Sequence, residues 1–461
     1  MVGNDTVGHP PPLPLRHHQR TPMRRLPLLL TTAALCGALA TAGALHHPTA
    51  DHTGSSGDDA AHAAGPRTAG SSLTRAITAE QQRLKALPND APGWARLGAE
   101  YVEQARLTAD PSYYPKADEA LHRSLTLAPD ANTEALTGLG ALANARHLFD
   151  RARDFAEQAI AASPAHWPAY AVLADARTQL GDDTGATDAV QQLLDRRPGT
   201  ASFTRAAYDL EQHGHPDQAR AALDSALASA FDPADKAFCR FQIAELDRNA
   251  GHPDQALTGY REALADDAGH TPALAGQARA EAALGNTEAA VRDYDAAIAK
   301  VPLPQYLLEL GELHESLGHP QLAQEQYRLL EAEQRLAAAN GVVDDLTLGQ
   351  YQADHGDPAE AVRLLRAEWQ RRHNVLVADA LAWALHRQGA DQEALDLAEQ
   401  AENHGWHNAV FLYHHGEIER ALGHTEAART HLTQALTTDP SFNPLHAPRA
   451  RADLAALTDT R

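Results

Sequence analysis

Cysteine is scarce in this sequence of 461 residues and occurs only at Cys36 and Cys239. Cys36 lies in an apolar N-terminal segment that is expected to be cleaved off or to sit in a membrane, so Cys239 stands alone in the rest of the chain. An intrachain disulfide is then impossible, and stability must come from side-chain packing. Cys239 is expected to be a small packing residue on a helix face, with a reactive thiol as the alternative.

Lysine and aromatic residues are also few. None of the four lysines falls in a phosphate-binding loop of the form G-x-x-x-x-G-K-S/T. Aromatic residues account for 5% of the chain, whereas alanine is abundant, as expected for helices that pack closely in pairs. The sequence has no convincing strand, no G-x-S-x-G nucleophile turn and no dinucleotide-binding fingerprint. These absences favour a non-enzymatic protein without a cofactor.

Histidine is frequent, yet no metal-binding spacing emerges from it. The segment His314–His319 is similar to the zinc-protease helix motif, which needs histidines at i and i+4. Here position i+4 is Gly318, which ends the predicted helix. Neither of the pairs His404–His407 and His414–His415 has a third ligand at a fixed offset. We therefore predict no metal site.

Acidic residues outnumber basic ones, 61 to 39, which gives a formal net charge of −22. Such a surface repels nucleic-acid phosphates and anionic lipids, so neither is an expected partner. Solubility explains the charge most simply, and a basic protein partner is the alternative.

A helical repeat of about 34 residues runs along most of the chain. Trp94, Leu97, Gly98 and Tyr101 stand in the spacing W-x2-L-G-x2-Y. A small residue then recurs every 33 to 42 residues, at Gly98, Gly140, Ala174, Ala207, Ala244, Ala278, Gly311, Gly349, Ala382 and Gly416. Each small residue lets the two helices of a repeat approach closely. Because two helices cannot bury their apolar faces alone, the repeats must stack on one another.

Glycine and proline mark the turn between the two helices of a repeat. The clearest turns are Gly214-His215-Pro216, Gly251-His252-Pro253, Gly318-His319-Pro320 and Gly356-Asp357-Pro358. Glycine suits the left-handed conformation after the first helix, and proline suits the first turn of the second.

These features resemble the tetratricopeptide repeat family. The second helix of that family carries a small residue, a large residue four positions later and alanine three after that, as in Ala290, Tyr294 and Ala297. The resemblance implies an all-α fold, a right-handed α-solenoid of about ten helix-turn-helix repeats over residues 73–445. Terminal capping helices are expected near 73–88 and within 446–461, because the end repeats have no outer neighbour.

The N-terminus has the layout of a signal peptide rather than of a repeat. Residues 1–45 are predicted to hold an extension and then a basic start at Met23–Arg25, an apolar run and small residues. We expect translation to begin at Met23. Residues 46–72 are polar and small and are expected to form a flexible linker.

The fate of this segment is left open by the sequence. Cleavage would release the solenoid outside the cytoplasmic membrane, whereas an uncleaved segment 26–45 is long enough to anchor it in the membrane. Anchoring as a lipoprotein at Cys36 is disfavoured because Leu35 stands where a small residue is expected.

The family resemblance implies a concave groove lined by the first helix of each repeat. The positions facing that groove give the predicted partner-binding residues Tyr208, Phe241, Arg248, Arg279, Trp383, His386, Tyr413 and Arg420. Aromatic and arginine side chains of this kind are typical interface anchors, although each aromatic residue could instead pack against the next repeat. The lysine and asparagine clamp that some family members use for a C-terminal carboxylate is absent from the first three repeats.

The predicted function is therefore a non-enzymatic scaffold that binds a protein or peptide in the groove, outside the cytoplasmic membrane. An assembly or regulatory subunit of an envelope enzyme complex is the alternative. An enzyme with a site at a repeat junction is a third possibility, which no motif supports. The oligomeric state is not predicted.

Overall fold

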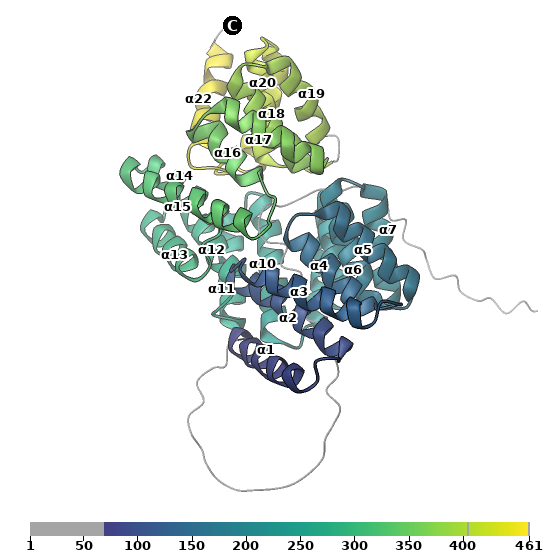
Figure 1. Ribbon diagram of the computed structural model, residues 1–461. Coiled ribbons are helices and arrows are strands. Elements are labelled where there is room, and N and C mark those ends of the chain that lie inside the picture. The colour runs from purple at the N-terminus through teal and green to yellow at the C-terminus, as the bar shows by residue number, and fades with distance from the viewer. Residues whose placement is uncertain (1–68, 403–404, 460–461) are drawn as a thin grey trace, which may run out of the picture.

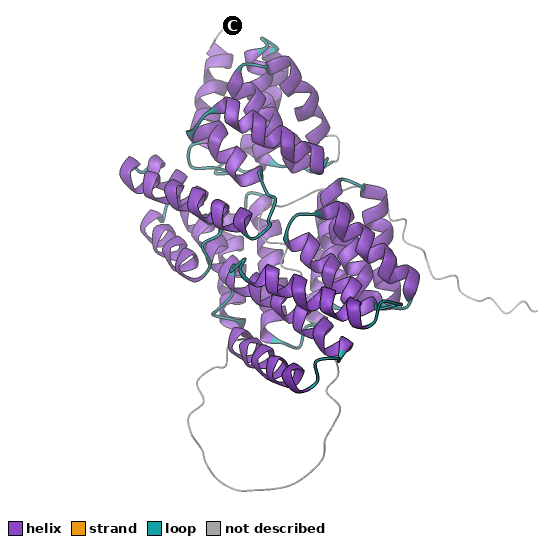
Figure 2. Cartoon of the chain, in the orientation of Figure 1, coloured by secondary structure: helices purple, strands orange, loops and turns teal. Residues whose placement is uncertain are grey.

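The computed structural model describes residues 69–402 and 405–459 (Figure 1). These residues contain 22 α-helices and no strand (Figure 2). The predicted all-α solenoid of helix pairs is confirmed. The predicted signal segment, the start at Met23 and most of the linker lie outside the described residues.

Ten consecutive helix pairs make up the solenoid, each packed against the next. In chain order the pairs are α2 (Ala91–Thr108) with α3 (Tyr113–Leu127), α4 (Thr133–Ala145) with α5 (Phe149–Ala162), α6 (Trp167–Leu180) with α7 (Asp183–Arg196), α8 (Thr200–Gln212) with α9 (Pro216–Ser229), α10 (Pro233–Asn249) with α11 (Pro253–Asp266), α12 (Thr271–Ala283) with α13 (Thr287–Lys300), α14 (Pro304–Ser316) with α15 (Pro320–Ala339), α16 (Leu346–His355) with α17 (Pro358–Arg371), α18 (Val375–Gln388) with α19 (Asp391–Glu402), and α20 (Ala409–Ala421) with α21 (Thr425–Thr438).

Single helices flank the ten pairs. Helix α1 (Ala69–Ala86) packs against α2, and α22 (His446–Asp459) packs against α21. Helix α1 begins four residues inside the segment expected to be linker. Among the described residues, no helix combines the length and the apolar character that a membrane crossing requires.

Small residues on the first helix of a repeat set how closely its two helices approach. A Cβ atom added at Gly98 or at Gly349 would lie 2.5 Å from the Cγ atom of a leucine on the second helix, Leu121 or Leu365 respectively. Both leucines are fully buried. Cys239 is equally buried, and burial raises the pKa of its thiol to about 12. It therefore acts as a packing residue, because the reactive thiolate form is suppressed.

The solenoid returns to contact itself along a line that we call the inter-turn seam. The turns inside repeats 2 to 5, near residues 146, 181, 214 and 251, meet the loops that follow repeats 7 to 10, near residues 343, 373, 405 and 438. The backbone N–H of Val343 donates to the carbonyl of Arg146 at 3.0 Å. The Arg372 and Asn374 side chains donate to Gln179, at 2.7 Å to its side-chain oxygen and 3.2 Å to its carbonyl.

Turn glycines at the seam approach carbonyl oxygens of the opposing loop directly. An added Cβ at Gly214 would lie 2.5 Å from the carbonyl oxygen of Gly405. One at Gly251 would collide with the carbonyl oxygen of Thr438 and lie 3.1 Å from the Cα atom of Asp439. The turn glycine Gly318, away from the seam, has no such neighbour within 4 Å.

Two identical Gly-His-Pro turns allow the seam to be tested. Gly251 and Gly318 have φ angles of 73° and 76°, so alanine is strained to the same extent at either position, by about 1 kcal/mol. Gly251→Ala should cost a further 1–3 kcal/mol, roughly the penalty of overpacking, because the Thr438 loop must move. The measurement is the urea midpoint of unfolding for both variants. Equal midpoints would contradict a tightly packed seam.

Candidate functional site

The inner face of the solenoid forms one elongated groove that encloses about 510 Å³. The first helices of repeats 3 to 10 line it, from α6 to α20, together with Tyr294 of α13, the loops around residues 406 and 439–444, and the start of α22. Because each of repeats 3 to 10 adds one first helix to this face, the groove continues across these repeats. We refer to it as the inner groove.

Aromatic side chains form much of the groove wall. They come from six of the repeats, from the loop between α19 and α20 and from the segment before α22, and comprise Tyr208, Phe238, Phe241, Tyr294, Tyr306, Trp383, Trp406, Phe411 and Phe442. The rings of Phe241 and Tyr260 lie 6.0 Å apart, which places a tyrosine of α11 behind this wall. Six of these nine side chains are buried, whereas Tyr208, Phe241 and Phe442 are partly exposed and can contact apolar or aromatic side chains of a ligand.

The groove arginines of repeats 4 to 6 are held in place by carboxylates. Arg205 makes a two-pronged ion pair with Asp175, with both N–O distances at 2.8 Å. Arg279 donates to both oxygens of Glu309 at 3.0 Å. Each pair joins a first helix to the first helix of the next repeat, so the ion pairs also fix the spacing of the repeats.

Glu245 is the centre of an ion-pair network in the groove. Arg248 donates to it at 2.9 Å, the Tyr260 hydroxyl donates at 2.5 Å, and Arg279 lies 3.6 Å away. Burial acts to raise the pKa of the Glu245 carboxyl, but Arg248 and Arg279 outweigh it and hold that pKa below its ordinary value. Glu245 is therefore ionised in the folded protein, and its charge balances the arginines.

Carboxylates exceed guanidinium groups around the groove. Seven lining residues are acidic (Asp175, Glu245, Glu309, Glu312, Asp354, Asp379 and Asp439), and four are arginines (Arg205, Arg248, Arg279 and Arg451). If its histidines are neutral, the lining has four positive and seven negative groups, and its net charge is −3. An acidic, aromatic-lined groove favours ligands that carry cationic and apolar groups together.

The segment before α22 crosses the C-terminal end of the groove. The Asn443 side chain donates to Glu312 of α14 at 2.8 Å. The rings of Phe442 and His446 lie 5.5 and 5.1 Å from the ring of Tyr413. This segment covers the face of α20 that the repeat pattern alone would leave open.

Five of the eight predicted site residues line the inner groove, namely Tyr208, Phe241, Arg248, Arg279 and Trp383. Trp383 contributes little surface to it, because its side chain is 4% exposed, stacks on His414 and donates to Asp354 at 3.0 Å.

The other three predicted residues lie outside the groove lining. Tyr413 is fully buried under Phe442 and His446, so it is a packing residue. His386 is bonded to Asp391 of the next helix at 2.6 Å. Arg420 is paired with Glu417 at 2.7 Å. The prediction placed all three by their helix positions. Those positions reveal neither the C-terminal segment that covers Tyr413 nor the carboxylates that pair with His386 and Arg420.

Several groove residues were missed by the sequence analysis. Trp406 lies in a loop between repeats, and Phe442 precedes the capping helix, so neither occupies a repeat position. Tyr306 stands near the start of α14, in a position that the groove rule does not include. The aromatic character of these residues was the one available signal.

Glu211 is a buried residue of α8 that lies near Glu245 and Arg248, and the pKa of its carboxyl is raised. Burial raises the pKa of its side chain to about 7, although the Asn249 amide donates to it at 2.6 Å. Glu245 raises that pKa further, and Arg248 lowers it. The folded state therefore binds a proton at Glu211 up to nearly neutral pH.

A model of the tetratricopeptide repeat family matches residues 241–303 and, in an overlapping match, residues 275–338. The family resemblance predicted from the repeats is confirmed over this part of the chain. The matched family consists of interaction repeats and is not a catalytic family. No curated protein matches the sequence.

Solved structures of repeat proteins resemble the chain more distantly. A tetratricopeptide repeat protein of Parabacteroides merdae is 18% identical, covers 56% of this chain and 98% of its own, and has a TM-score of 0.34. A thermophilic TPR protein of Thermus thermophilus is 22% identical, with 41% and 98% covered and a TM-score of 0.37. The human IFIT1 dimer with PPP-AAAA is 14% identical, with 79% and 87% covered and a TM-score of 0.43. None of these similarities identifies a partner for this chain.

Replacing Glu211 with glutamine should change how stability depends on pH. Between the ordinary pKa near 4.5 and the folded value near 7, the unfolded chain binds fewer protons at this position than the folded one. The wild type therefore loses stability relative to Glu211→Gln as pH rises through this range, by up to roughly 3 kcal/mol. Urea unfolding at pH 5 and pH 8 measures the difference, with the exposed Glu288→Gln as control. A difference that stays constant with pH would contradict the raised pKa.

Proposed function

We propose that this chain, whose residues 241–338 match the tetratricopeptide repeat family, is a protein-interaction scaffold. In this proposal the inner groove holds an extended segment of a partner protein. The observation that carries the proposal is the groove itself, which runs across repeats 3 to 10 and contains aromatic residues from six of these repeats and ion-paired arginines from repeats 4 to 6. Extended concave surfaces of this kind are what stacked repeats offer to partners.

The charge of the groove sets the chemistry of the partner segment. Arg205 and Arg279 each bind two carboxylate oxygens, and Arg248 binds Glu245. A carboxylate or phosphate on a ligand would have to compete with these partners and enter a lining of net charge −3. A segment with lysine or arginine between apolar residues fits better, since its cations can face the excess carboxylates and the aromatic rings.

We also propose that the scaffold acts outside the cytoplasmic membrane. The support is the order of a basic start at Met23–Arg25, an apolar run over residues 26–45 and small residues at its end. Cell fractionation with N-terminal sequencing of the recovered protein tests this. A cytoplasmic protein that keeps residues 26–45 would contradict it.

Peptides selected by the groove should be basic and apolar. Panning a random peptide library on the purified protein is expected to enrich sequences with lysine or arginine beside aromatic or aliphatic residues. The double variant Tyr208→Ala, Phe241→Ala should bind a selected peptide at least 10-fold more weakly, because each lost anchor removes on the order of 1–2 kcal/mol. Fluorescence anisotropy with a labelled peptide gives the affinities.

Phe231 provides the matched control for this experiment. It is 92% exposed and lies in the loop before α10, outside the groove lining. Phe231→Ala removes as much aromatic surface as Phe241→Ala and should leave the affinity unchanged. Enrichment of acidic peptides, or equal weakening by Phe231→Ala, would show that the inner groove is not the binding surface.

A further inference from the structure

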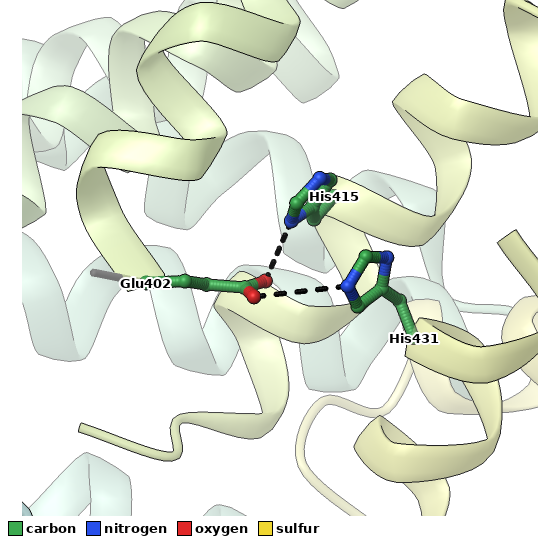
Figure 3. A group of neighbouring side chains, drawn as sticks. All are labelled: Glu402, His415 and His431. Atoms are coloured by element: carbon green, nitrogen blue, oxygen red, sulfur yellow. Dashed lines mark hydrogen bonds and ion pairs between the residues drawn. The ribbon is translucent and has the colours of Figure 1, made fainter. Parts of the chain in front are cut away.

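Three helices bring Glu402, His415 and His431 together (Figure 3). None of the three lines the inner groove. Glu402 is the last residue of α19, His415 lies in the middle of α20, and His431 lies in the middle of α21. In the part of the chain that the structure describes, they form the one group of three or more possible ligands close enough for a metal ion.

The ligand atoms of this group converge on the Glu402 carboxylate. His415 Nδ1 lies 2.8 Å from one oxygen of Glu402, and His431 Nε2 lies 3.8 Å from the other. One potential ligand atom from each residue lies within 4.8 Å of the others. Two ligands of a tetrahedral zinc ion lie about 3.4 Å apart, given bonds of about 2.0–2.1 Å. Side-chain rotations that shorten the longest of these separations by at most about 1.4 Å would complete the set.

Without an ion, the group is poorly satisfied as a hydrogen-bonded cluster. The two imidazole rings stack at 4.0 Å with 22° between their planes. The 3.8 Å separation of His431 from Glu402 is too long for a hydrogen bond. His415 Nε2 and His431 Nδ1 are buried and have no hydrogen-bond partner. Binding a cation between the rings and the carboxylate would use all three groups at once.

Glu419 is placed to orient His415 as a ligand. One of its oxygens lies 3.6 Å from His415 Nε2, on the opposite edge of the ring from Glu402. A shift of a few tenths of an ångström would bring this oxygen within hydrogen-bond distance of the Nε2 proton. The lone pair of Nδ1 would then face Glu402, where an ion would bind. Metal-binding histidines usually have such a carboxylate behind them, and it fixes the tautomer and the ring orientation.

We propose that Glu402, His415 and His431 bind one Zn²⁺ ion, with Glu419 as the positioning residue behind His415. Two imidazoles and one carboxylate, without a thiolate, suit zinc and leave its fourth position for water. Solvent reaches the group, since the Glu402 and His431 side chains are 22% and 19% exposed. The ion would tie α19, α20 and α21 together next to the loop in which Gly405 contacts Gly214. This proposal does not depend on the function of the inner groove.

The test measures zinc and cobalt binding by the purified chain after treatment with EDTA. Competition with a chromophoric chelator gives the number and affinity of tight Zn²⁺ equivalents, and Co²⁺ gives visible bands that report four-coordination. Glu402→Gln and His431→Gln remove one ligand each at partly exposed positions. Glu419→Gln removes the positioning residue. His386→Gln is the matched control because His386 is bonded to Asp391 and packs against Trp383, outside the group of three ligands.

The wild type should bind one tight equivalent of Zn²⁺, show the Co²⁺ bands and melt at a higher temperature with zinc. Glu402→Gln and His431→Gln should lose that equivalent, the bands and the thermal shift. Glu419→Gln should bind about 10–100-fold more weakly, and His386→Gln should match the wild type. The proposal is overturned if Glu402→Gln and His431→Gln, folded by circular dichroism, keep the wild-type stoichiometry and affinity. Equal loss in His386→Gln would overturn it as well.

Discussion

The inner groove depends on the contact of four turns with four loops that lie between 187 and 197 residues further along the chain. Stacking of neighbouring repeats determines the local angle between helix pairs, but it does not bring repeat 2 to repeat 7. The seam does so through backbone contacts, such as the bond between Val343 and Arg146, and through glycines that have no side chain to hold the loops apart. Because the seam closes the solenoid, first helices from repeats 3 to 10 face a common space.

Charged side chains are not kept out of the inner groove; they are stabilised there by pairing with one another. Buried carboxylates and guanidinium groups lose hydration, and that loss is offset only when each finds a partner with good geometry. Arg205 with Asp175 and Arg279 with Glu309 meet this condition and at the same time join adjacent repeats. The excess carboxylates lie in the C-terminal half of the groove, where histidines, Trp383 and Asn443 form hydrogen bonds with them.

The helix pairs could be predicted from the sequence, but the contacts that the solenoid makes in its interior could not. Small residues such as Gly98 and Gly349 recur because each touches a leucine within its own repeat, so their spacing records local packing. Tyr413 occupies a groove position by the same rule, yet Phe442 covers it from a segment beyond the repeats. Glu402 and His431 reach His415 from separate helices, with no fixed offset that a motif search could recognise.

The seam also limits how this chain can change by duplication. In an open solenoid a repeat can be gained or lost with little effect on distant ones, since each repeat contacts only its neighbours. Here repeats 2 to 5 each meet the loop that follows the repeat five places later. One repeat inserted between repeats 5 and 7 would shift every partner by one place. The turn at Gly251 would then face the loop that follows repeat 9 in the present chain, instead of the loop that follows repeat 10. The number of repeats between the two halves of the seam is therefore fixed as firmly as the register of paired strands in a sheet.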